Sequence, residues 1–125
     1  MSKSLHFGAL LAFGLVTVMA LPQAAFAFGA LAIDSNHGSA YGFSHDYSTR
    51  RDAENEAMSE CGSDCTIVVE FQRGCAAYAA DQRAGSSVYG WVNNVSSEAV
   101  AEHGALAQCA RHGGRSCLVR VWACE

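Results

Sequence analysis

The chain has 125 residues, half of them hydrophobic, with 8 basic and 12 acidic side chains and a formal net charge of −4. A chain of this length corresponds to one domain. Its acidic balance leaves no basic stripe that could neutralise phosphates, which argues against nucleic acid and against an anionic membrane as partners.

The N-terminal segment predicts export. An uncharged apolar run extends from Phe7 to Leu21, Pro22 interrupts it, and Ala25-Phe26-Ala27 has the small-x-small pattern that signal peptidase recognises. An N-terminal membrane anchor is the alternative, but the run is shorter than the roughly 20 residues that span a bilayer. We therefore expect a signal peptide at residues 1–27 and a secreted or periplasmic mature protein without a stable membrane anchor.

The six cysteines predict disulfides, because an exported chain enters an oxidising compartment. A metal site is the alternative, with His112 near two of the cysteines. Only Cys61 and Cys65 have the close spacing of zinc ligands, and the C-x-x-C pair of redox proteins is absent. We expect neither a metal nor a cofactor. The mature chain, with seven arginines and twelve acidic residues, has a net charge of −5.

The mature chain contains an internal repeat. The pattern Ala-Glu-x-x-Ala-x-x-x-Cys occurs at residues 53–61 and returns at residues 101–109, 48 positions later. We predict a single domain, residues 28–125, made of two copies at about 28–74 and 75–125.

Each copy predicts the element order β-β-α-β. The expected hairpin strands are 30–34 with 41–43, and 77–81 with 89–91. A glycine follows the tyrosine in each second strand, which indicates a bulge or a close backbone approach. Serine or threonine precedes each helix as an N-cap, and the apolar residues at spacings 0, 4, 5 and 8 form one helix face. The closing strands are 66–71 and 118–122. The fold class is therefore α+β, with helices packed on antiparallel sheet and a pseudo-twofold relation between the copies.

The cysteines fall into two sets of three, which restricts their pairing. The first set is Cys61, Cys65 and Cys75, and the second is Cys109, Cys117 and Cys124. Three cysteines cannot all pair within one set, so we expect at least one bond to fasten the two copies together. A symmetric arrangement is favoured among the fifteen possible ones: Cys61–Cys65, Cys109–Cys117 and Cys75–Cys124.

Two groups of polar residues are candidates for catalysis. Asp34 and Asp81 end the first strand of each copy, so symmetry could bring two carboxylates together for acid–base chemistry. The alternative is that each aspartate caps its hairpin loop, which is the common role of aspartate at a strand end. His45 with Asp46 and nearby serines could form a hydrolase dyad, although no nucleophile motif accompanies them. We assign no catalytic residues.

Aromatic side chains are the best candidates for a binding surface. Tyrosine and tryptophan are enriched where proteins bind one another, and some of them must lie near the surface of so small a domain. The candidate residues are Tyr41, Tyr89, Trp91 and Trp122.

The recurring motifs also carry a family resemblance. The Ala-x-Ala strand that ends in aspartate, the Tyr-Gly step, the Ala-x-x-x-Ala-x-x-x-Cys helix and the last strand with its final cysteine resemble the bacterial family called domain of unknown function 4189. The resemblance covers about Phe28 to Cys124. It implies a small exported protein, often with a tandem repeat, and no established enzymatic activity. The second copy departs from the first by a longer helix–strand loop (110–116) and an expected shorter last strand.

The function expected from the sequence is that of a disulfide-stabilised module that binds another protein, as an inhibitor, an immunity-type partner or an effector. A small envelope hydrolase with a cryptic carboxylate or histidine site is one alternative. A structural component of the cell envelope is another. We do not expect an enzyme.

Overall fold

The computed structural model describes residues 14–19, 27–34 and 40–125. The expected signal peptide lies largely outside these residues. No helix among the described residues is long and apolar enough to cross a membrane.

Residues 28–34 and 40–124 fold in the order β-β-α-β, twice. The elements are β1 (Phe28–Asp34), β2 (Tyr41–Tyr47), α1 (Arg50–Cys61), β3 (Cys65–Phe71), β4 (Cys75–Asp81), β5 (Tyr89–Val95), α2 (Glu98–Arg111) and β6 (Cys117–Cys124). This order confirms the predicted α+β class. The last strand of the second copy has 8 residues against 7 in the first, so the expectation of a shorter last strand was wrong.

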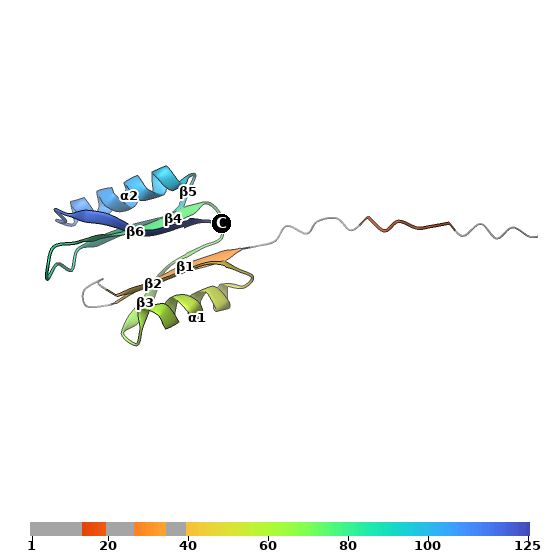
Figure 1. Ribbon diagram of the computed structural model, residues 1–125, viewed down its shortest axis with the longest axis horizontal. Coiled ribbons are helices and arrows are strands. Elements are labelled where there is room, and N and C mark those ends of the chain that lie inside the picture. Colours follow the sequence, from red (N-terminus) through yellow and green to blue (C-terminus); the bar gives the residue numbers. More distant parts are fainter. Residues whose placement is uncertain (1–13, 20–26, 35–39) are drawn as a thin grey trace, which may run out of the picture.

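Each copy forms its own three-stranded antiparallel sheet. The strand orders are β2-β1-β3 and β5-β4-β6, with the first strand of each copy in the centre. The two sheets face one another in the middle of the molecule, and one helix covers the outer face of each sheet (Figure 1). Because β3 contacts β5 and β2 contacts β6, the copies are related by a pseudo-twofold axis that runs roughly along the strands.

Small side chains allow each helix to lie close to its sheet. Thr49 and Ser97 cap the two helices, each accepting a backbone N–H of the first turn, as the sequence predicts. The buried face of each helix consists of two alanines and a cysteine: Ala53, Ala57 and Cys61 in α1, and Ala101, Ala105 and Cys109 in α2. Gly42 and Gly90 lie opposite these faces. A Cβ on Gly42 would collide with the Ala57 carbonyl oxygen, so the glycine marks a close backbone approach.

The two sheets enclose the main core, to which both copies contribute. Its buried members are Leu31, Ile33, Phe43, Val69, Phe71, Ala76, Tyr78 and Ala123. Tyr78 is fully buried, and its ring centroid lies 4.8 Å from that of Tyr41 in the other copy. Burial raises the pKa of the Tyr78 hydroxyl well above its ordinary range, with smaller contributions from Tyr89 and Tyr41. Apolar burial between the sheets therefore holds the two copies together.

Three disulfides cross-link the described residues, and no cysteine is free. The bonds are Cys61–Cys65, Cys109–Cys117 and Cys75–Cys124, the pairs of the symmetric arrangement. The first two each join the end of a helix to the start of the next strand. Their presence is consistent with an oxidising compartment.

No disulfide joins the two copies, and that expectation was wrong. Cys75 is the first residue of β4 and pairs directly with Cys124 of β6, its neighbour in the same sheet. The cysteine belongs to the second copy because the repeat itself begins there. The two sets of three cysteines therefore do not coincide with the two copies of the fold: the first copy contains two cysteines and the second contains four.

Candidate functional site

The four candidate aromatic residues do not form one surface. Tyr41, Tyr89 and Trp91 are half-buried and pack against the core between the sheets. Trp122 is 43% exposed, although it lies in a strand. The structure therefore directs attention to β6, where Trp122 lies.

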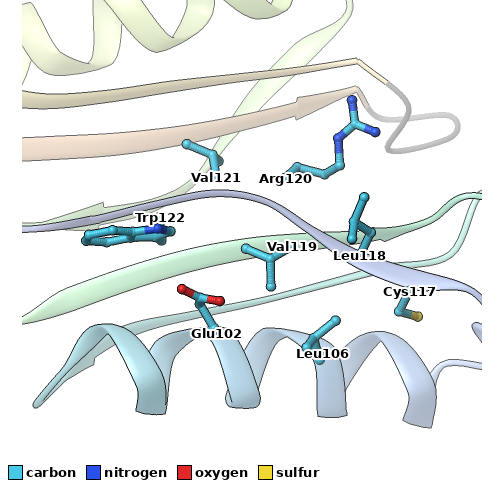
Figure 2. Close-up of a pocket in the computed structure, with 8 residues that line it drawn as sticks. All are labelled: Glu102, Leu106, Cys117, Leu118, Val119, Arg120, Val121 and Trp122. Carbon is cyan, nitrogen blue, oxygen red and sulfur yellow. The ribbon is translucent and has the colours of Figure 1, made fainter.

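A groove runs between α2 and β6, with a volume of about 510 Å³. Its lining residues come from these two elements only: Glu102, Leu106, Cys117, Leu118, Val119, Arg120, Val121 and Trp122 (Figure 2). A second hollow of about 290 Å³ shares Glu102 and Leu106 with it and extends along α2. The strand contributes residues in unbroken succession, which places the groove along the edge of β6.

The edge strand β6 has a neighbour on one side only. In the order β5-β4-β6 it pairs with β4, and its other edge has no partner among the described residues. Opposite Tyr78 and Ala79 lie Val121 and Val119, so Arg120 is a bulged residue between them. Arg120 donates a hydrogen bond to Gln82 Oε1 (2.6 Å) and points away from α2 (Figure 2).

Large apolar side chains are exposed along this edge. Leu118 is 55% exposed and Trp122 is 43% exposed. Val119 points into the groove toward Leu106 of α2 (Figure 2). An exposed, apolar edge strand is a template for pairing with another chain, and most proteins protect such edges with charges or prolines.

The equivalent edge of the first copy is polar. Positions 118 and 122 of β6 correspond to Thr66 and Glu70 of β3, as the strand pairings show. Glu70 Oε2 pairs with Arg50 of α1 at 3.1 Å. A hydrogen bond with Glu54, followed by burial, raises the pKa of Glu70. At these two equivalent positions the exposed side chains are thus polar on β3 and apolar on β6.

The helix side of the groove is negatively charged. Glu98 and Glu102 lie one helical turn apart on α2, and the groove and the adjoining hollow include them. Burial, followed by the hydrogen bond and charge of Glu102, raises the pKa of Glu98. The structure records no ion pair to either carboxylate among the described residues. In the first copy the position of Glu98 belongs to Arg50, which supplies a cation there.

Asp34 and Asp81 end the central strands, β1 and β4, whose carboxyl ends lie at the same end of the molecule (Figure 1). Asp81 is buried, and its carboxylate accepts hydrogen bonds from Arg83 Nε (2.8 Å), Ser86 Oγ (2.7 Å) and the Ser116 N–H (2.9 Å). The hydrogen bonds from Arg83 and Ser86 hold the pKa of Asp81 well below its ordinary range. Asp81 therefore joins the hairpin loop to the start of β6, in keeping with the loop-capping role.

His45 lies at an exposed end of β2 beside Asp46, with 2.9 Å between Nδ1 and Oδ2. The Asp46 N–H donates to Glu125 Oε1 at 2.7 Å, and ligand atoms of these three residues lie within 4.8 Å of one another. They could hold a cation. Sequence reasoning missed Glu125, which the fold brings from the far end of the chain. Ser44, the serine next to His45, is buried and donates to the Ala53 carbonyl, so it is not placed as a nucleophile.

Fold and site together define a small, disulfide-cross-linked α+β sandwich whose two closing strands differ. The exposed side chains are polar on β3, and β6 has exposed apolar side chains beside a groove. The chain belongs to the family described as a domain of unknown function (DUF4189), whose model matches residues 28–124. This confirms the resemblance found in the sequence. No curated protein and no solved structure matches the chain.

Proposed function

We propose that this protein is an exported module that binds another protein at the groove between α2 and β6. The observation that supports this proposal is the apolar edge of β6, with Leu118 and Trp122 exposed beside the groove. Tryptophan buries about 150–250 Å² on contact and is over-represented among residues that dominate binding energy. An edge strand of this kind also offers backbone groups to a partner.

Export is part of the same proposal. The apolar run from Phe7 to Leu21 and the Ala25-Phe26-Ala27 pattern are typical of a cleaved signal peptide. The three disulfides are consistent with the oxidising compartment into which such a peptide leads. The partner would then be a protein of the cell envelope or of the extracellular medium.

Site-directed photo-cross-linking tests this function. A photoreactive amino acid is placed at position 118 or 122 of β6, and at the equivalent positions 66 and 70 of β3 as controls. We expect one protein of the producing cells or their surroundings to cross-link from the two β6 positions and not from the two β3 positions. Excess unlabelled protein should compete, and the L118T/W122E variant should not. Equal cross-linking from β3 and β6 would contradict a site at the groove.

A further inference from the structure

We infer that the occupant of the groove is an extended segment of a partner protein, which adds as a strand to the edge of β6 and carries lysine or arginine beside Glu98 and Glu102. This inference rests on the proposed function and names the partner's backbone conformation and charge. The partner segment would carry apolar residues on both faces, and its lysine or arginine on the face toward α2.

The backbone of β6 supports strand addition. Its free edge has no partner among the described residues, and an edge strand presents a row of N–H and C=O groups that an extended peptide satisfies. The groove follows six successive residues of β6, from Cys117 to Trp122. A strand rises about 3.4 Å per residue, so this edge suits an extended segment.

The side chains beside the edge select apolar residues. In an added strand, alternate side chains point to opposite faces of the extended sheet. Those that face α2 would lie against Leu106, Val119 and Trp122, which line the groove. Those on the opposite face would lie near Leu118, whose strand partner Ala80 packs against the core between the sheets.

The carboxylates of α2 select positive charge. Glu98 and Glu102 lie beside the same hollow, and the charge of Glu102 disfavours the charged form of Glu98, so a cation from a partner would be favourable there. The first copy illustrates this physical solution, because Arg50 of α1 pairs there with Glu70 of β3. In the second copy Glu98 replaces the arginine and Trp122 replaces the glutamate. Arg120 lines the groove but bonds to Gln82 and points away from α2, so a partner would supply the cation.

A second copy of this chain is a poorer occupant. Each mature chain carries a net charge of −5, and the copies would bring Glu98 and Glu102 with no additional lysine. Antiparallel pairing of two β6 strands in the register centred on Arg120 would place Arg120 opposite its own counterpart, and like charges directly opposite are unfavourable. The charge of the groove therefore favours a basic segment of a different protein.

Selection from a displayed peptide library tests the inference. The oxidised mature protein is immobilised, and random nine-residue peptides are selected against it, with the L118T/W122E variant as the matched counter-target. This variant places the β3 residues at the equivalent β6 positions, which the same fold already accommodates. We expect enriched peptides to combine apolar residues with at least one lysine or arginine, and to bind the variant at least tenfold more weakly.

Two further measurements on an enriched peptide separate the parts of the inference. Hydrogen exchange should slow at the β6 amides and leave the β3 amides unchanged, because only β6 gains backbone hydrogen bonds. The E98Q/E102Q variant should bind the peptide several-fold more weakly, with the T66S variant as control. No enrichment over the variant, enrichment of acidic peptides, or unchanged exchange at β6 would each overturn the inference.

Failure of strand addition and failure of the proposed function give different results. If photo-cross-linking identifies a partner at positions 118 and 122 while β6 exchange is unchanged, the binding function stands and strand addition is wrong. If the protein forms a dimer that the L118T/W122E variant loses, the occupant is a second copy and the basic partner is wrong. If neither cross-links nor peptides distinguish β6 from β3, both proposals fail.

Discussion

At the scale of single residues, Asp81 and Gly90 show how much of this fold depends on local contacts. Asp81 is buried and accepts hydrogen bonds from Arg83 and Ser86 in the loop after β4, and from Ser116, the residue before β6. Gly90 lies where the backbone of α2 meets the sheet. Both residues have counterparts in the first copy, Asp34 and Gly42, at the same places in the strand order.

Replacing Asp81 by asparagine should change the pH dependence of stability. The folded-state pKa of Asp81 is below its unfolded value of about 3.9, so its contribution is present above about pH 4 and is lost as the pH falls toward the folded value. The difference in unfolding free energy between wild type and D81N should therefore shrink as the pH is lowered below about 4. Urea unfolding between pH 7 and pH 2.5 measures it, with D64N at an exposed aspartate as the matched control. A constant difference across this range would contradict the role assigned to Asp81.

Replacing Gly90 by alanine should destabilise the fold by about 1–3 kcal/mol, the usual range for overpacking. The added Cβ would collide with the Cys109 backbone nitrogen and lie 2.6 Å from the Ala105 carbonyl oxygen, and neither can move without shifting the helix. G104A is the control, because the atom nearest to its Cβ would be in the Val92 side chain, at 2.9 Å, and alanine favours the helix by about 1 kcal/mol. Thermal unfolding should show the larger loss for G90A; a larger loss for G104A would contradict the close-approach argument.

At the scale of elements, the disulfides act within the copies. Cys61–Cys65 and Cys109–Cys117 close short loops of the chain, with sequence separations of 4 and 8. Cys75–Cys124 has a separation of 49 and joins β4 to the edge strand β6. Because β6 also carries the exposed groove, this bond fixes one end of the proposed binding strand.

The long-range bond should contribute most to stability. Chain-entropy estimates give about 4 kcal/mol for a loop near 50 residues and about 2 kcal/mol for the loop that Cys61–Cys65 closes. The C75A/C124A variant should therefore unfold at a lower denaturant concentration than C61A/C65A. Guanidinium unfolding of the two purified variants measures the order, with mass spectrometry to confirm that the remaining two bonds are intact. The reverse order would show that loop closure is not the dominant effect.

At the scale of the whole molecule, the two copies share one core and no covalent cross-link apart from the chain itself. Tyr78 of β4 lies at the centre of this core, and the rings of Tyr41 and Tyr89 lie beside it with centroids 4.8 and 6.0 Å away. Since the core between the sheets contains buried residues of both copies, we expect the copies to unfold together.

Truncating Tyr78 should loosen both copies at once. Y78A should destabilise the protein by about 3–5 kcal/mol, the range for removing a buried aromatic ring, and Y78F should lose less because the ring remains. Far-ultraviolet circular dichroism and tryptophan fluorescence should report the same urea midpoint in each variant. Two separate transitions would mean that the copies fold independently.

Local patterns in the sequence determined the repeat, the order of elements and the alanine faces of both helices. These features depend on residues within a few positions of one another, so spacing and capping rules identify them. The helix faces at Ala53 and Ala101 and the caps at Thr49 and Ser97 are examples. The apolar residues Leu118 and Trp122 could also have been singled out by aligning the two closing strands and noting that Thr66 and Glu70 are polar.

Only the tertiary structure decided how the copies meet. A strand pattern does not state which face packs on which partner, so it could not show that Tyr41, Tyr89 and Trp91 lie against the shared core while Trp122 is exposed. Nor could it show that Cys75 and Cys124 are neighbours in one sheet, because that depends on strand order and register. The groove lies along β6, which has a neighbouring strand, β4, on one side only. That position at the edge of the sheet depends on the strand order of the assembled fold.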